Sequence, residues 1–342
     1  AGIAAIDVTD SASIRGTLGV DFAGFTPTVG DTWEFVDASS ISGSFGSLQA
    51  PASLTDAGLG LVVSTVNGVA NGMVARLGLE AQLVLSVDRG SGAVAIENRA
   101  TVNNVEIDGY GIISPEGAID TSSWTSLESQ GEAGWSADQS PTANHLGETA
   151  LQGSRVFAGE SIVALGDLYS IAPAELGQPY PDLQFEYHLA GGDVRVGTVE
   201  MSGPLNDLVL VVNPDTGESA IQNQSPFDLT IDSYGILSES NSLDTDGWMS
   251  FQDAGVGDWL EANPASNHIG ETNLDSFLDL NRQGEPLPLG SLFDADSPEA
   301  VRDLGFEFRL DTGEIRTGSV HYGDTVEFEI PMICGDFDAD GD

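Results

Sequence analysis

The sequence predicts an all-β protein in which two homologous antiparallel β-sandwich domains, of the jelly-roll or immunoglobulin-like kind, follow a short β-rich segment. Two observations carry this prediction. Short apolar runs alternate with Gly, Pro, Asn and Asp turns, which is typical of antiparallel sandwiches. A long unit also occurs twice, with a period of about 124 residues, the difference between Trp124 and Trp248.

The repeat holds its register over most of its length. The opening stretches match with a single one-residue gap, so that Ile96 corresponds to Ile221 and Tyr110 to Tyr234. Further matched pairs are Asn98 and Asn223, Trp135 and Trp259, and the Asn-His-x-Gly-Glu-Thr runs at 144–149 and 267–272. Solenoid repeats are far shorter than this unit, which has the size of a whole domain. We therefore predict sandwich domains at residues 80–203 and 204–333.

Residues 1–79 form the leading β-rich segment. Their expected strands are 3–8, 13–22, 32–36, 58–66 and 73–79, separated by turn residues, and no part keeps a helical period for three turns. The segment shows no obvious core of its own. We therefore expect it, or the edge strands of the sandwiches, to mediate assembly by strand addition.

The charge balance is extreme, with 54 acidic residues against 10 basic ones, all of them Arg, and a net charge of −44. Such a chain repels itself unless salt or bound cations screen the charge. Nucleic acid is excluded as a partner because phosphate binding needs clustered basic residues, which are absent. No apolar run is long enough to span a bilayer, so membrane insertion is not expected. The single cysteine, Cys334, cannot form an internal disulfide.

The last residues, 334–342, contain the first half of an EF-hand loop. Asp336, Asp338 and Asp340 occupy loop positions one, three and five, Gly341 occupies position six, and Asp342 follows. This spacing lets alternate carboxylates converge on one Ca²⁺. The glutamate of position twelve is missing, so we expect the natural chain to continue and this piece alone to bind Ca²⁺ weakly.

The duplicated Asn-His-x-Gly-Glu-Thr run has two interpretations. His145 with Glu148, and His268 with Glu271, offer a nitrogen and a carboxylate to a metal in each copy. No third ligand recurs in both copies. A turn whose His and Asn side chains hydrogen-bond the backbone is the favoured interpretation.

The duplicated tryptophans also have two interpretations. Trp124, Trp135, Trp248 and Trp259 could stack on sugar rings if exposed, as in carbohydrate-binding modules. Indoles at fixed repeat positions are more often packed beneath a long loop, where each buries a large apolar area. Packing is therefore the favoured interpretation.

Acidic loops are further candidates for Ca²⁺ binding, at residues 244–246, 253–258 and 294–303. A solvated, salt-adapted surface is the alternative interpretation and is narrowly favoured. We found no nucleophile elbow, zinc-protease helix, P-loop or dinucleotide-binding motif, and we predict that the chain is not an enzyme.

The repeat also resembles a known family. The pattern LxLxVNxxTGxxxIxNxS, then IDxYxIxSxSxSL and a Trp, is similar to a tandem sandwich repeat of large secreted surface proteins of planctomycete-type bacteria. The run GTLGVDFAGFTPTVGDTWEFVDASSISGSFGSL resembles the closing turns of β-helices in such proteins, and the acidic tail resembles a dockerin loop. The resemblance implies an extracellular location and a modular scaffold.

The expected function is therefore structural. We predict a self-assembling surface-layer, filament or adhesin component that is stabilised by divalent cations and that contacts itself or neighbouring surface proteins. The alternative is a pair of carbohydrate-binding modules from a secreted polysaccharide-degrading system, which exposed tryptophans would favour.

Overall fold

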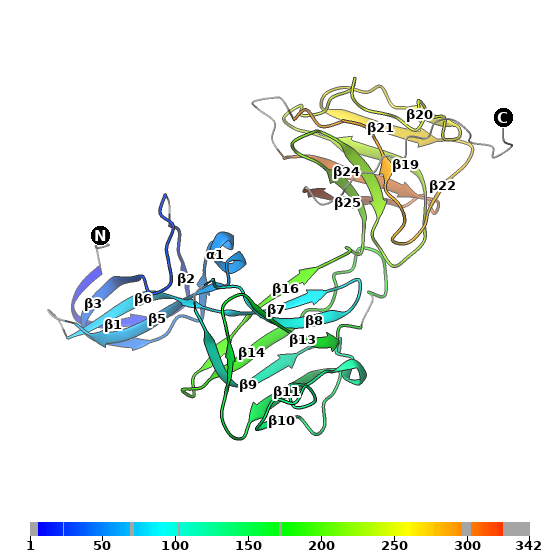
Figure 1. Cartoon of the computed structure of the whole chain (residues 1–342). Coiled ribbons are helices and arrows are strands. Elements are labelled where there is room, and N and C mark those ends of the chain that lie inside the picture. The colour runs from blue at the N-terminus through cyan, green and yellow to red at the C-terminus, as the bar shows by residue number, and fades with distance from the viewer. Residues whose placement is uncertain are drawn as a thin grey trace. The chain divides into compact units, whose positions relative to one another are not determined.

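The computed structural model describes residues 6–22, 24–68, 72–101, 103–170, 173–295 and 302–323 (Figure 1). Strands dominate these residues, which confirms the predicted all-β fold with sandwich domains after a β-rich segment. Helical structure among them is confined to the single turns α1 (Ala52–Asp56) and η1 (Thr121–Ser123). No helix in the described ranges has the length and apolar composition that crossing a bilayer takes.

The leading segment forms a four-stranded sheet in the order β1-β3-β6-β5, with β2 and β4 paired separately. β1 runs parallel to β3 and β2 runs parallel to β4, whereas β6 is antiparallel to both β3 and β5. The strands are β1 (Ile6–Ile14), β2 (Thr17–Gly19), β3 (Thr32–Gly43), β4 (Ser47–Gln49), β5 (Leu59–Asn67) and β6 (Met73–Ala81). The segment also buries apolar side chains of its own, including Val36, Leu54 and Val74. The expectation that it has no core is therefore wrong.

The first sandwich consists of two sheets. One has the order β10-β11-β9-β14-β15, with β12 also on β9, and the other has the order β13-β8-β7-β16. The strands are β7 (Leu83–Asp88), β8 (Ala93–Asn98), β9 (Val105–Ile113), β10 (Trp135–Ala137), β11 (His145–Ala150), β12 (Arg155–Phe157), β13 (Ser161–Asp167), β14 (Gln184–Leu189), β15 (Val194–Val196) and β16 (Thr198–Ser202). All pairs are antiparallel except β7 with β16, the first and last strands.

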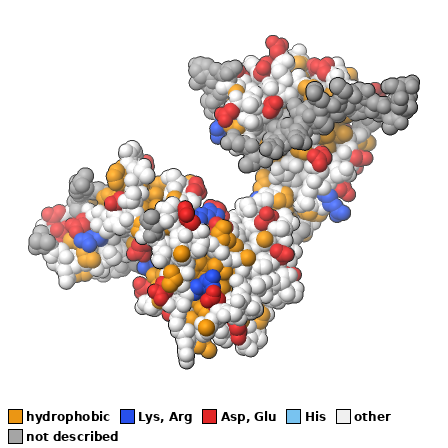
Figure 2. Space-filling view, viewed as in Figure 1, with side chains coloured by type: hydrophobic (Ala, Val, Ile, Leu, Met, Phe, Trp, Pro, Cys, Tyr) orange, Lys and Arg blue, Asp and Glu red, His pale blue; other side chains and the backbone are white. Residues whose placement is uncertain are grey.

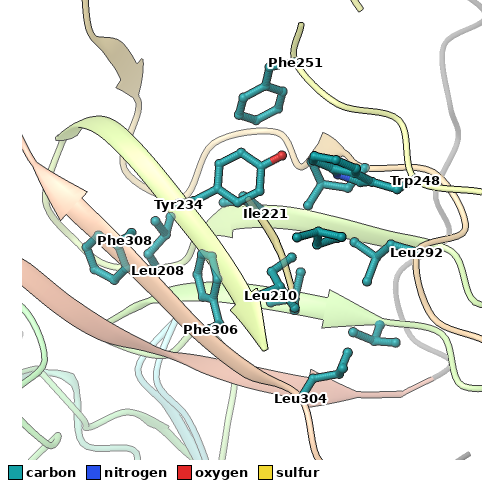
Figure 3. Packing of buried hydrophobic residues seen from close by; sticks show 14 of the residues in the cluster. Leu208, Leu210, Ile221, Tyr234, Trp248, Phe251, Leu292, Leu304, Phe306 and Phe308 are labelled. Atoms are coloured by element: carbon teal, nitrogen blue, oxygen red, sulfur yellow. The ribbon is translucent and has the colours of Figure 1, made fainter. Parts of the chain in front are cut away.

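The second sandwich has the same two layers, but β25 pairs with a strand of each layer and so joins them into one continuous nine-stranded sheet. The strand order is β20-β21-β19-β24-β25-β17-β18-β23, with β22 on β19. Its strands are β17 (Leu208–Val212), β18 (Ser219–Asn223), β19 (Leu229–Leu237), β20 (Trp259–Glu261), β21 (His268–Asn273), β22 (Leu278–Leu280), β23 (Leu287–Pro288), β24 (Gly305–Leu310) and β25 (Ile315–Tyr322). Its core combines aliphatic side chains of β17 with aromatic residues such as Tyr234, Phe306 and Phe308 (Figure 3).

A glycine lets the last strand of each copy pass from one sheet to the other. The first half of β25 pairs with β24 and its second half pairs with β17. Gly318 lies at the crossing, where an added Cβ would lie 2.5 Å from the Leu208 carbonyl oxygen and 2.5 Å from the Phe306 ring. In the first copy, Gly197 separates β15 from β16. A Cβ added at Gly197 would likewise come too close to the Phe185 ring and to the Leu83 carbonyl oxygen. Strands that change sheets in a sandwich bend at such points.

The chain divides into two compact units close to the predicted boundary. The first comprises the described residues up to 170 with Pro181–Gly203, and the second begins at Pro204. Residues 173–180 belong to the second unit, although they lie within the first repeat in sequence. Asn206 Nδ2 donates to the Glu175 and Gln178 carbonyls at 2.6 and 3.0 Å, and Arg316 Nη1 donates to the Leu176 carbonyl at 2.9 Å. These bonds attach the segment to the second sandwich.

Candidate functional site

The most distinctive polar group in each sandwich is a buried tyrosine–glutamate pair. Tyr110 on β9 and Glu148 on β11 lie directly opposite each other, and the tyrosine hydroxyl donates to Glu148 Oε2 at 2.5 Å. Glu148 is only 3% exposed. Its two carboxylate oxygens also accept hydrogen bonds from the backbone of the loop between β9 and β10, from Leu127 N at 2.6 Å and Glu128 N at 2.9 Å. The glutamate therefore fastens this loop to the sheet.

The second sandwich contains the same arrangement. Tyr234 donates to Glu271 Oε2 at 2.5 Å, and Glu271 accepts from Phe251 N at 2.7 Å and Gln252 N at 2.8 Å. Glu271 is 1% exposed. A carboxylate with three donors satisfies the requirement that a buried charge be hydrogen-bonded. We call each set of carboxylate, tyrosine and two loop amides a loop clamp.

The clamp also fixes the ionisation of its tyrosines. Burial, followed by the negative charge of Glu148, raises the pKa of Tyr110 far above its usual value. Burial and Glu271 do the same to the pKa of Tyr234. Because these hydroxyls must stay neutral in the folded state, the stability they contribute is complete below the unfolded pKa of about 10 and falls as the pH rises above it.

We therefore expect Tyr110 and Tyr234 to ionise only when the protein unfolds. In an alkaline titration followed at 295 nm, part of the tyrosinate absorbance should appear together with the loss of near-ultraviolet circular dichroism. Tyr234→Phe should lower the amplitude of that late phase and leave the earlier phase unchanged. Ionisation of every tyrosine before any loss of tertiary signal would contradict the clamp.

The duplicated tryptophans pack around the clamps. Trp135, Trp248 and Trp259 are 5%, 6% and 3% exposed, and Trp124 is half-buried. The Tyr234 ring centroid lies 5.2 Å from that of Phe251 and 6.0 Å from that of Trp259. In Figure 3, Tyr234 lies below Phe251 and its hydroxyl points toward Trp248. Trp135, Trp248 and Trp259 are therefore buried, as the packing interpretation predicts, and the four indoles do not form one exposed surface on which a sugar could stack.

In each copy, one indole nitrogen of this aromatic layer makes no well-aligned hydrogen bond. The indole Nε1 of Trp124, and that of Trp248, are buried and make no well-aligned hydrogen bond. Each lies close enough to its clamp tyrosine to oppose slightly the rise in that tyrosine's pKa. The indoles thus contribute packing more than hydrogen bonding.

The proposed metal pairs are not brought together. His145 and Glu148 are three residues apart on β11, and side chains three apart on a strand point to opposite faces. His145 is exposed while Glu148 is buried in its clamp, and the half-buried His268 and buried Glu271 on β21 divide in the same way. Within the described ranges, no group of three or more His, Cys, Asp or Glu side chains is placed to hold a metal ion.

The asparagines of the repeat do bond the backbone. Asn144 Nδ2 donates to the Ser114 carbonyl at 2.9 Å, as the turn interpretation predicts. Asn98 Nδ2 donates to the Asn103 and Phe157 carbonyls at 2.7 and 2.8 Å. Its counterpart Asn223 donates to the Phe227 and Leu280 carbonyls at 2.7 and 3.0 Å. These two asparagines, whose role the sequence does not reveal, join two strands and the loop before a third strand in each sandwich.

The acidic loops use several of their carboxylates internally. Asp244 Oδ1 accepts from Asp246 N at 2.9 Å, which forms a local turn. Asp303 accepts from Ser238 Oγ at 2.9 Å and Ser240 N at 2.7 Å. Partial burial alone would raise the pKa of Asp303, but these hydrogen bonds outweigh it and lower the pKa below its usual range. The candidate ligands Asp336, Asp338, Asp340 and Asp342, and part of 294–303, lie outside the described residues.

An open trough lies on the outer face of the first sandwich and was not expected from the sequence. Its floor is made by glycines of β9 and β11, and its volume is about 650 Å³. In register across the sheet, Gly147, Gly111 and Glu186 form one row, and Thr149, Gly109 and His188 form the next. Alternate glycines along β9 were the signal that could have indicated it. The trough presents imidazole, carboxylate and hydroxyl groups, which suit a polar or cationic ligand.

The second copy fills the matching position with its own side chain. Arg309, the counterpart of His188, forms an ion pair with Asp232 at 2.6 Å and reaches Thr272 Oγ1 at 3.4 Å. The outer faces of the two sandwiches therefore differ, whereas their clamps are the same.

Comparison with known proteins gives no family. No protein-family model and no curated protein match this sequence. Among solved structures, the crystal structure of CBD12 from CALX1.2 is similar over 72% of this chain and 82% of that chain, with 10% sequence identity and a TM-score of 0.22. A similarity of this quality carries no conclusion about function.

Proposed function

We propose that this protein is a non-catalytic structural component of an extracellular surface assembly. In this role the two sandwiches act as rigid modules, and divalent cations, Ca²⁺ above all, neutralise the charge. The observation that carries the proposal is that the polar residues shared by the two copies form hydrogen bonds inside the protein. This holds for the clamp pairs and for the asparagines Asn98 and Asn223.

This pattern supports a scaffold over a duplicated binding or catalytic site. A site that acts on ligands leaves polar groups converging on an accessible cavity. Here the two copies share the hydrogen bonds of the clamps and of the two asparagines, and they differ on their outer faces, as His188 and Arg309 do. The duplication therefore preserves the interactions that make each module rigid.

The charge supports the cation part of the proposal. A net charge of −44 without any lysine destabilises a compact chain by self-repulsion, and multivalent cations relieve this repulsion most effectively. Figure 2 shows acidic side chains spread over the visible face and not gathered in one patch. Such a distribution suits screening and bridging between neighbouring molecules. An extracellular medium rich in salt or Ca²⁺ supplies these conditions, in line with the resemblance to secreted surface proteins.

Sedimentation velocity of the full chain tests this proposal. With millimolar Ca²⁺ we expect larger species or a more compact monomer of higher thermal stability, and both effects should disappear with chelator. Matched samples in NaCl of equal ionic strength, and in Mg²⁺, separate specific bridging from screening. An identical sedimentation coefficient and melting temperature in all four buffers would contradict the cation-stabilised scaffold.

A further inference from the structure

The leading segment contains two stacked coils of a parallel β-solenoid. β1 pairs with β3 in parallel, with Ile14 opposite Gly43, and β2 pairs with β4 in parallel, with Thr17 opposite Ser47. The offsets are 43 − 14 = 29 and 47 − 17 = 30 residues, so one coil takes about 30 residues. Two separate parallel pairs with almost the same offset mean that whole coils, and not single strands, lie on each other.

The corner between the strands is stacked as well. Gly46 N donates to the Gly16 carbonyl at 2.7 Å, which places the second corner directly on the first. Next to it, the hydroxyls of Thr17 and Ser47 form a hydrogen bond of 2.8 Å. Gly16 has φ of 84°, a conformation that favours glycine. The coil is therefore a repeated unit of strand, glycine corner and short strand.

The two ends of this stack differ. On the side of the second coil, β6 pairs with β3 in antiparallel fashion and β5 follows, so this hairpin ends the parallel stack. On the side of the first coil, the part of the chain that the structure describes places no strand beside residues 8–14 of β1 or beside β2. These two edges, which we call the open coil end, contain no proline and no lysine, and their irregularities are Asp10 and the register shift between Val8 and Ser11.

We propose that the open coil end binds a further parallel coil, so that the partner of this segment is the end of a β-solenoid with strand, glycine corner and short strand in the same order. This inference rests on the proposed scaffold role, which it deepens by naming the kind of partner. Main-chain hydrogen bonds along both edges would provide the affinity, and the fixed corner would provide the register.

The geometry selects this occupant over a second copy of the chain. A copy related by a two-fold axis would place its β1 antiparallel to this β1, and its corner would then point the wrong way for β2 to pair at the same time. A copy related by translation would have to offer the other end of its stack, which β6 already occupies. Only a coil of parallel sense meets both edges together.

The test is to supply such a coil within the full chain. A 30-residue insert, made of the sequences of residues 36–49 and then 20–35, is placed directly before Ile6, so that the inserted Val36 precedes Ile6 by the native 30 residues. Amide hydrogen exchange is measured by NMR in chelator, where the protein is kept monomeric. We expect exchange to slow by at least about tenfold at those amides of residues 8–14 and 17–19 that face away from the second coil.

The matched control carries an insert of the same composition in scrambled order. Exchange in the second sandwich reports that both proteins are folded. Equal exchange of residues 8–14 and 17–19 in the two extended proteins would overturn the inference. Because no Ca²⁺ is present, this result is independent of the sedimentation experiment, and either proposal can fail without the other.

Discussion

Replacing Glu271 with alanine is expected to destabilise the second sandwich by about 4 kcal/mol, because three buried donors lose their acceptor at once. These donors are the Tyr234 hydroxyl and the backbone amides of Phe251 and Gln252. For a domain of this size, such a loss lowers the melting temperature by on the order of 10–20 °C, which differential scanning calorimetry resolves.

Two substitutions calibrate that result. Glu271→Gln keeps one acceptor oxygen and should lose less stability than the alanine variant. Glu285→Ala removes an exposed carboxylate of the same domain and should leave the melting temperature unchanged. If Glu271→Ala melted like Glu285→Ala, the clamp would not hold the loop. Glu148→Ala should reproduce the loss in the first sandwich, since its hydrogen bonds are the same.

The second large effect is expected at the strand crossing. Gly318→Ala places a Cβ 2.5 Å from a backbone oxygen that cannot move without shifting β17, and 2.5 Å from the Phe306 ring. We expect a loss of about 3 kcal/mol from overpacking, measured by urea denaturation of the full chain. The m-value should be unchanged if the fold is kept.

Gly235→Ala is the matched control for the crossing. Gly235 lies in β19 of the same sandwich, its φ is not positive, and an added Cβ would meet nothing within 4 Å. Alanine there should be neutral or slightly stabilising, because it reduces the freedom of the unfolded chain. Equal midpoints for the two variants would show that the crossing does not require glycine.

Much of the fold follows from patterns that the sequence displays twice. The register of the repeat, from Ile96 with Ile221 to Trp135 with Trp259, pairs residues that occupy equivalent strands in the two sandwiches. The burial of the indoles also follows, because a large apolar side chain at a fixed repeat position gains most from packing.

The clamp could be predicted only in part. Tyr110 and Glu148 both recur in the second copy, but they are 38 residues apart, and only the pairing of β9 with β11 places them opposite each other. The metal hypothesis failed for a local reason. His145 and Glu148 lie three residues apart on strand β11, so their side chains point to opposite faces of the sheet.

The solenoid character of the leading segment was indicated by resemblance, but its open coil end could not be derived from the sequence. Parallel pairing joins residues about 30 positions apart, and with only two coils there is no periodicity to detect. The same holds for residues 173–180, whose attachment to the second sandwich depends on single hydrogen bonds such as that from Arg316.

The parallel pairing of first and last strands has a mechanical consequence. In each sandwich the strand that begins the module lies beside the strand that ends it, β7 with β16 and β17 with β25, in the same direction. Tension applied to the two ends of a module therefore pulls these neighbours past each other, and the hydrogen bonds between them are loaded in shear. They must break together and cannot peel apart one by one. A chain built from such modules resists stretching along its length through the geometry of its terminal strands.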